Sequence, residues 1–268
     1  MLNIFNETFI VFDLETTGLY PEKGARVCEI GALRYEKGRQ SETFSQLIYP
    51  QMSMPPEASR VNGIYDIDLA GVPVFSEIAE DFLAFIGDSP VFGYKIGFDM
   101  GFVNNELEIM AGEPLKNKAY DVLLLAKEVV KGLPGYSLSS VAGYFDINTG
   151  TSHRAFDDAK TTAEVFKRLL EIQNYQSQRF NNIEDLYELC GYPRKKVINT
   201  DFYNKIQEKI QKGLLIELEY RSGKGEVTRR QVQPLRLESR GTEEVLIGKC
   251  ILRNDMRSFN LSRIIRCV

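Results

Sequence analysis

Two carboxylates lie two residues apart near the start of the chain, at Asp13 and Glu15. An apolar run before them, Phe9–Val11, predicts a short buried strand. Residues two apart in a strand point to the same side, so both carboxylates are expected on one face while Leu14 points to the other. Such a pair is costly at the end of a buried strand unless a cation lies nearby. Alone, the pair is better explained as a solvated strand end, because short motifs often arise by chance.

A distant aspartate and the only histidine of the chain occupy positions where functional groups are common. Asp99 lies at the start of a predicted helix, where the helix dipole alone also favours an aspartate. His153 lies in a loop that enters the last long predicted helix, beside Asp157 and Asp158. One of these two aspartates is expected to stabilise the helix start, which leaves the other free. A neutral imidazole in that setting is suited to proton transfer.

The elements that must position these groups predict an α/β domain over residues 1–172, with a mixed sheet flanked by helices. Strand patterns occur at Thr8–Asp13, Arg26–Tyr35, Ser41–Tyr49 and Pro90–Tyr94. Helical patterns occur at Phe75–Ile86, Phe98–Ala111, Val122–Val130, Ser137–Tyr144 and Asp157–Ile172. Acidic groups therefore collect near strand ends and helix starts.

Residues 173–268 have a different predicted secondary structure from residues 1–172. Residues 173–200 are predicted to be a connector with one short helix at Ile183–Cys190. Residues 201–268 are predicted to be a small, mostly β, barrel-like domain that begins with one helix, near the practical minimum size for an independent core. Its strand candidates are Leu214–Tyr220, Glu226–Leu237, Glu244–Leu252 and Ser258–Cys267.

The amino-acid composition indicates a globular protein. The chain has 268 residues, 43% of them hydrophobic and 26% charged, as is typical of globular proteins. Residues 201–268 carry 14 Lys+Arg against 9 Asp+Glu, a net of +5, whereas residues 1–200 carry 19 against 28, a net of −9. The basic part is where a polyanion could bind. The four scattered cysteines, the absence of a signal-like N-terminus and the absence of a membrane-length apolar run lead us to expect a cytoplasmic protein without a zinc site.

Taken together, the pattern resembles the DnaQ-like 3′→5′ exonucleases of the DEDDh type, which have a ribonuclease H-like fold. The resemblance covers residues 6–172 approximately. It is carried by five ordered motifs: Phe12–Leu19, Val27–Ala32, Asn62–Ile64, Phe98–Asp99 and His153–Ala159.

The resemblance implies a role for each matching residue. Asp13, Glu15, Asp99 and Asp158 would be metal ligands, and His153 would be the general base. Two divalent cations, Mg²⁺ or Mn²⁺, would be bound, which agrees with the preference of hard cations for carboxylate oxygen. The substrate would be a 3′ end of single-stranded DNA or RNA, and the products nucleoside 5′-monophosphates. The residues implied to contact that substrate are Thr16, Gly18, Leu19 and Phe98.

Two motifs depart from the family pattern. The usual H-N-A-x-F-D reads Tyr94–Asp99 here, with Lys95 in place of a polar amide, and the usual H-G-I is Asn62–Ile64. Lys95 is either a phosphate contact or a solvated side chain. These departures concern substrate preference and leave the catalytic set complete.

Residues 201–268 resemble a WYL domain, a small β-barrel of bacterial regulators proposed to sense nucleic-acid or nucleotide ligands. The name-giving tripeptide is absent, since Glu244–Leu246 stands in its place. Guanidinium groups donate two parallel hydrogen bonds to phosphates and stack on bases. For each arginine, a ligand-binding role and a place on an exposed strand face are both open. The ligand candidates are Tyr220, Arg230, Arg253, Arg257 and Arg263.

The sequence thus favours a metal-dependent 3′→5′ exonuclease, acting in DNA repair, replication or another pathway, with a C-terminal nucleic-acid-binding or ligand-sensing domain. One alternative is a nucleotide- or oligonucleotide-responsive regulator in which the WYL-like domain gates the nuclease domain. Another is a polymerase proofreading subunit. The sequence predicts no membrane partner and does not determine the oligomeric state.

Overall fold

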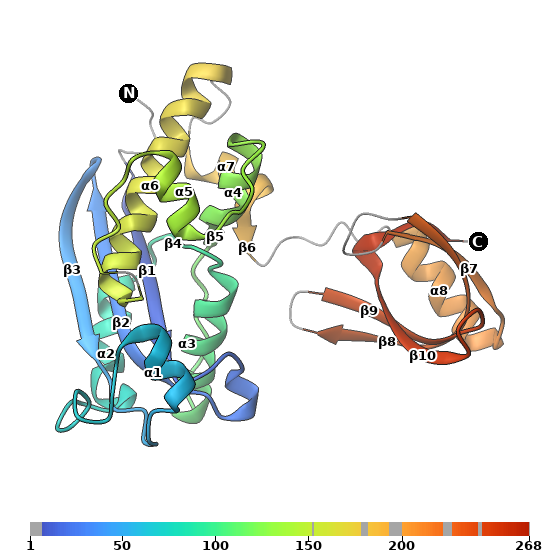
Figure 1. Cartoon of the computed structure of the whole chain (residues 1–268), viewed down its shortest axis with the longest axis horizontal. Coiled ribbons are helices and arrows are strands. Elements are labelled where there is room, and N and C mark those ends of the chain that lie inside the picture. Colours follow the sequence, from blue (N-terminus) through green and yellow to red (C-terminus); the bar gives the residue numbers. More distant parts are fainter. Residues whose placement is uncertain are drawn as a thin grey trace. The chain divides into compact units, whose positions relative to one another are not determined.

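The computed structural model describes residues 7–151, 153–177, 182–192, 200–221, 227–240 and 243–267. The chain divides into two compact units, Met1–Pro193 and Arg194–Val268, which are described separately here (Figure 1). None of the helices in the described ranges has the length and apolarity that crossing a bilayer requires.

The first unit contains a six-stranded mixed sheet in the order β3-β2-β1-β4-β5-β6. Its strands are β1 (Phe9–Thr16), β2 (Val27–Glu36), β3 (Arg39–Leu47), β4 (Val91–Gly93), β5 (Ala119–Asp121) and β6 (Gly191–Tyr192). β1 pairs antiparallel with β2 and parallel with β4, and β6 pairs antiparallel with β5. This mixed sheet with flanking helices confirms the predicted fold class.

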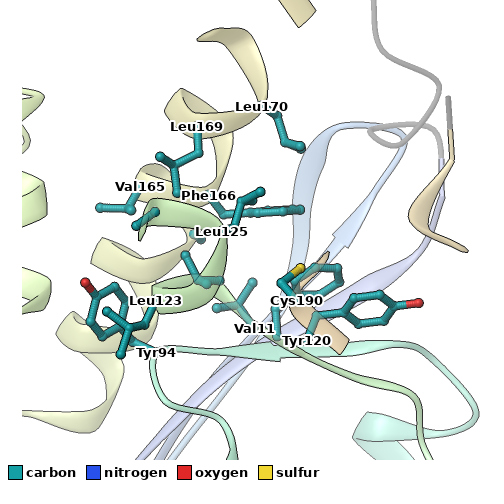
Figure 2. Packing of buried hydrophobic residues seen from close by; sticks show 14 of the residues in the cluster. Val11, Tyr94, Tyr120, Leu123, Leu125, Val165, Phe166, Leu169, Leu170 and Cys190 are labelled. Carbon is teal, nitrogen blue, oxygen red and sulfur yellow. The ribbon is translucent and has the colours of Figure 1, made fainter. Parts of the chain in front are cut away.

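Helices cover both faces of this sheet (Figure 1). They are α1 (Pro56–Asn62), α2 (Phe75–Ile86), α3 (Gly97–Ile109), α4 (Val122–Val129), α5 (Leu138–Tyr144), α6 (Ala155–Ser177) and α7 (Ile183–Cys190), with a short 3-10 turn, η2 (Pro21–Lys23). One core joins the sheet to α4, α5, α6 and α7. Figure 2 shows part of it, with labelled side chains from β1, β5, α4, α6 and α7 packed together. The second core joins the opposite face to α2 and α3.

The two cores divide the residues of β1 by their period of two. Phe9 and Val11 are buried in the core that contains α6, whereas Ile10, Phe12 and Leu14 are buried in the core that contains α2 and α3. The next residues on the α6 side of the strand are the two acids of the D-x-E motif. The apolar alternation therefore fixes the face on which these acids emerge.

Three segments of the first unit differ from the sequence-based expectations. Residues 183–192, predicted as part of the connector, form α7 and β6, which pack in the first unit. The short strand β5 and the helix α1 were not predicted. Both lack the length that makes a hydrophobic period visible.

The second unit is a five-stranded antiparallel sheet in the order β10-β9-β8-β7-β11, preceded by α8 (Thr200–Lys212). Its strands are β7 (Ile216–Arg221), β8 (Val227–Arg240), β9 (Glu243–Cys250), β10 (Asp255–Asn260) and β11 (Ile264–Cys267). The segment predicted as one strand, Ser258–Cys267, is broken by a 3-10 turn, η3 (Leu261–Arg263). Ile206 of α8 is buried among strand residues and closes this core.

Candidate active site

The strand β1 presents the first two acids. Asp13 lies directly opposite Gly31 of β2, and Glu15 lies opposite Glu29. Both acids are half-buried. They sit at the end of the strand where the chain turns away from the sheet, and the Thr16 hydroxyl fixes that turn by donating to the Gly18 carbonyl at 2.7 Å.

The helix α3 supplies the third acid. Asp99 is in its first turn and only 2% exposed. Its carboxylate accepts hydrogen bonds from its own backbone amide and from that of Leu14 in β1. The start of α3 is therefore tied to the strand that carries Asp13 and Glu15.

The start of α6 supplies the remaining two groups. Asp158 accepts a hydrogen bond from the backbone amide of His153 at 3.2 Å, which closes the loop onto the first helical turn. His153 itself has a φ of 62°, in the left-handed region that a non-glycine residue seldom adopts. Ligand atoms of Glu15, His153 and Asp158 all lie within 4.8 Å of one another. Glu15, near the start of the domain, therefore lies beside His153 and Asp158, near its end.

The carboxylates influence one another electrostatically. Burial, followed by the charges of Asp99, Asp158 and Glu15, raises the pKa of Asp13 well above its ordinary value. Burial also raises the pKa of Asp99, against the two backbone hydrogen bonds that it accepts. The four acids therefore act on one another electrostatically and resist simultaneous ionisation, and a cation would relieve that resistance. Among the described residues, the ligand atoms that lie within 4.8 Å of one another belong to Glu15, His153 and Asp158.

Burial also raises the pKa values of Glu15 and Asp158. Burial, then the charges of Asp158 and Glu29, raise the pKa of Glu15 to about 8, and the Asn62 side chain opposes the shift by hydrogen bonding to it. Burial raises the pKa of Asp158, and the hydrogen bond from the His153 amide lowers it. The arrangement is a set of oxygen ligands suited to hard divalent cations.

A further acid, Glu29, anchors the start of α6 on β2. Its carboxylate receives Nη2 and Nε of Arg154 at 2.7 and 3.1 Å and the backbone amide of Ala155 at 3.0 Å. Glu29 is 2% exposed, so the pair is largely protected from water at that end. Because Glu29 is the cross-strand neighbour of Glu15, the anchor places α6 directly beside the D-x-E motif.

Gly31 allows α6 to approach that closely. A Cβ at this position would lie 2.1 Å from the backbone nitrogen of Phe156 and 2.3 Å from the carbonyl carbon of Ala155. Only glycine lets the helix start lie on the strand at this distance. Since Gly31 is opposite Asp13, the close approach occurs beside the first acid of the site.

A second buried ion pair anchors α3 on β2. Glu106 is 1% exposed and receives Nε and Nη2 of Arg26 at 2.8 and 2.7 Å and the backbone amide of Val27 at 3.1 Å. Glu106 lies two helical turns after Asp99 on the same helix. The strand β2 therefore holds both helices that bring acids to the site, although none of the proposed ligands lies on β2.

The sequence pattern did not predict a role in the site for Glu29, Arg154, Arg26 or Glu106. A signal for Glu29 was visible, since an acid within the apolar run Val27–Ala32 requires a partner. Its partner lies 125 residues away in the chain, and no local pattern points to it.

The residues predicted to contact substrate surround the turn after β1. Gly18 is half-buried, and Leu19 is 69% exposed. Phe98 is half-buried, and its ring packs on Phe102 with centroids 4.8 Å apart. The Thr16 hydroxyl donates to the Gly18 carbonyl at 2.7 Å, and the Thr16 carbonyl accepts from Nδ2 of Asn62 at 3.4 Å.

The ligand candidates of the second unit are dispersed: Tyr220, Arg230 and Arg257 lie on three different strands, Arg253 in the turn between β9 and β10, and Arg263 in η3. Tyr220 packs edge-on against Phe259, and its hydroxyl accepts the Asn260 amide at 3.3 Å, so this residue serves the core. Arg230 donates to Thr228, and Arg257 pairs with Asp255 at 3.0 Å. Arg253 and Arg263 are exposed.

The fold and the acidic cluster define the class of protein, a nuclease with a ribonuclease H-like sheet. The exonuclease family model matches residues 10–166, more than half of the chain, and the WYL domain model matches residues 201–267. The chain belongs to the exonuclease family, in its DnaQ-like branch, and carries a C-terminal WYL domain. It is a 3′→5′ exonuclease, as the sequence predicted.

Curated relatives support this assignment. The DNA polymerase III subunit epsilon of Aquifex aeolicus is 38% identical over 169 residues, covering 63% of this chain and 83% of the relative. The subunit epsilon of Treponema pallidum is 37% identical over 164 residues, covering 60% of this chain and 76% of the relative. Both matches leave more than a third of this chain uncovered.

Solved structures share the fold. The nuclease domain of 3′hExo, a DEDDh family member bound to rAMP, has a TM-score of 0.55 at 16% identity and covers 62% of this chain and 92% of its own. E. coli Exonuclease I in complex with a dA16 oligonucleotide has a TM-score of 0.56 at 16% identity and covers 90% of this chain and 55% of its own.

Proposed function

We propose that the enzyme hydrolyses the terminal phosphodiester bond of single-stranded DNA or RNA, releasing nucleoside 5′-monophosphates from the 3′ end with the help of two divalent cations. The observation that carries this proposal is the meeting of Glu15, His153 and Asp158, whose ligand atoms lie within 4.8 Å of one another, beside Asp13, whose pKa the charges of Asp99, Asp158 and Glu15 raise. The relatives are named as subunits of a DNA polymerase, which supports DNA as the first substrate to test.

In this mechanism Asp13, Glu15, Asp99 and Asp158 would hold Mg²⁺ or Mn²⁺. The donors fit such ions, because all four are carboxylates whose pKa values are raised by burial and whose neighbouring charges a cation would balance. When bound, the cations would stabilise the charge that develops on the phosphate during in-line displacement. The chain's part is to fix the four oxygens by anchoring α3 and α6 on β2.

His153 would act as the general base that accepts the proton of the attacking water. It is exposed, so a water molecule can reach its ring, and the hydrogen bond from its amide to Asp158 fixes its backbone beside the acids. A neutral imidazole has the proton affinity required near neutral pH.

The test is a degradation assay with 5′-labelled single- and double-stranded DNA and RNA in the presence of Mg²⁺ or Mn²⁺. We expect a ladder that shortens from the 3′ end, and little product from oligonucleotides with a blocked 3′ terminus. Asp13→Ala should abolish the ladder. The absence of a ladder on every substrate, or an unchanged ladder in Asp13→Ala, would contradict the proposal.

A second candidate is a polymerase proofreading subunit, which the 38% identity to a subunit epsilon favours. In that case the full chain should bind a replicative polymerase and remove a mismatched 3′ nucleotide faster than a paired one. Equal rates on mismatched and paired ends, together with no complex in gel filtration, would exclude it.

We further propose that the WYL domain binds nucleic acid or a nucleotide and either holds the substrate or gates the nuclease. The family match and the net charge of +5 of residues 201–268 support this role. Arg253 and Arg263 are the better candidates, because Arg257 is paired with Asp255 and Tyr220 packs in the core. Substitution of both arginines by alanine should weaken binding of a single-stranded oligonucleotide, with the rate on a mononucleotide ester unchanged.

A further inference from the structure

A pocket with a volume of about 540 Å³ lies in the segment between β3 and α2. Its lining includes Tyr49, Met52, Asp66, Leu69 and Val72. We call it the Asp66 pocket. Its volume falls within the usual range of small-molecule sites, roughly 300–1,000 Å³. None of the groups assigned to catalysis above lines it.

The Asp66 pocket adjoins the turn that follows the first two acids of the active site. Met52 accepts a hydrogen bond from the Thr17 hydroxyl at 3.6 Å, and Thr17 is two residues past Glu15. The pocket is therefore close to the place where the 3′ end of the proposed substrate would bind.

The floor of the pocket is fixed by packing. Leu69 is 2% exposed and packs in a small core with Cys28, Met54 and Ile64, and Val72 packs against the same core. The backbone of Tyr49 is held at one wall, because its amide donates to the Pro73 carbonyl at 2.8 Å. The Tyr49 side chain is 44% exposed, so its ring is available for stacking.

The charged group of the pocket is the Asp66 carboxylate, and Ser53 adds a hydroxyl to the lining. Oδ1 of Asp66 accepts the backbone amide of Met54 at 2.7 Å. Among the described residues, no donor occupies Oδ2, and no lysine or arginine lines the pocket. A phosphate would be repelled by the carboxylate, whereas a neutral planar group with a donor would be accepted.

We propose that the Asp66 pocket receives one unpaired nucleobase of the substrate and prefers a base with an exocyclic amino group. The base would stack on Tyr49 and contact the Met52 thioether, as unpaired bases do on aromatic side chains. Its amino group would donate to Oδ2 of Asp66, as the N4 amino group of cytosine donates to carboxylates. Thymine and uracil present an acceptor oxygen at that position, and the carboxylate disfavours them. This inference rests on the proposed nucleic-acid substrate.

The activity test uses the full chain and 5′-labelled oligonucleotides in which dC, dT or an abasic site occupies one position at a time near the 3′ end. At one position we expect dC to be processed about five- to tenfold faster than dT, the factor for one partly exposed hydrogen bond to a charged acceptor. Asp66→Asn should remove or reverse that preference, because its Nδ2 donates to the thymine oxygen while Oδ1 still accepts from Met54. Tyr49→Ala should slow both oligonucleotides, and Tyr49→Phe should retain the wild-type rate.

Matched controls are Asp88→Asn and Tyr144→Ala, which replace exposed residues outside the pocket and should leave the preference unchanged. A dC:dT ratio that is the same in wild type and Asp66→Asn, or no position with a preference, would overturn the inference. Binding of the same oligonucleotides in EDTA, followed by fluorescence anisotropy, separates the two proposals. A preference lost in Asp66→Asn supports the pocket even if no substrate is degraded, whereas degradation without any preference supports the nuclease alone.

Discussion

The guanidinium of Arg154 meets the carboxylate of Glu29 at 2.7 Å, and the same carboxylate receives the backbone amide of Ala155 at 3.0 Å. Glu29 is the cross-strand neighbour of Glu15, so this contact fixes α6 beside the first acids of the site. The residue that follows His153 therefore determines where His153 and Asp158 lie, although it is not expected to contact substrate itself.

The first prediction is that Glu29→Ala lowers kcat by about ten- to a hundredfold, with a smaller change in KM, as for groups that orient metal ligands. The physical reason is that Arg154 and the Ala155 amide lose their acceptor and the start of α6 is released. Steady-state kinetics on a single-stranded oligonucleotide measure this. Glu184→Ala is the matched control, since it removes an exposed pair with Lys118 at 2.6 Å and should leave kcat unchanged. An equal loss in both variants would contradict the positioning role.

The second prediction concerns Gly31. Gly31→Ala should destabilise the protein by about 1–3 kcal/mol and abolish most activity, because the new methyl group meets the backbone of Phe156 and displaces α6. Gly101→Ala is the control, since a Cβ in that helix meets nothing within 4 Å and should stabilise it by about 0.5–1 kcal/mol. Urea unfolding of both variants tests the pair. Equal stabilities would show that α6 can move away from β2 without cost.

The sequence predicted the elements that carry the candidate site because their signals are local, whereas the assignment of the site residues stays a prediction. The two-residue spacing of Asp13 and Glu15 predicted one face for both acids, and the apolar period of α2 gave the observed bounds Phe75–Ile86. The anchors Glu29–Arg154 and Arg26–Glu106 were not predicted, because each pairs residues about 80 or more positions apart. Short strands such as β6 carry too few residues for a period to be read.

The third prediction links pH, stability and cations. Burial raises the pKa of Glu15 to about 8, whereas its ordinary value is 4.5. Between these values the folded chain without cations binds more protons than the unfolded chain, so its stability should fall as pH rises from about 4.5 to 8. After allowance for solvent screening we expect a loss on the order of 1–3 kcal/mol. Thermal unfolding in EDTA across this range measures it.

Adding Mn²⁺ should reverse that loss, and the gain should be larger at pH 8 than at pH 5, because cations bind the ionised acids. Glu15→Gln should reduce both the decline in EDTA and the gain with Mn²⁺. A gain that is independent of pH in wild type would show that these acids do not hold the ion.

The last prediction separates two roles for His153, whose ring lies near Glu15 and Asp158 and could either accept a proton or bind a cation. His153→Gly is the informative variant, because the backbone φ of 62° suits glycine and the change should not destabilise the fold. If His153 is the general base, kcat should fall by about 10²–10⁴-fold, and added imidazole should restore part of it. The Mn²⁺ concentration for half-maximal activity and the thermal gain with Mn²⁺ should stay at wild-type values. If His153 is a ligand instead, both cation measurements should shift and imidazole should not restore the rate.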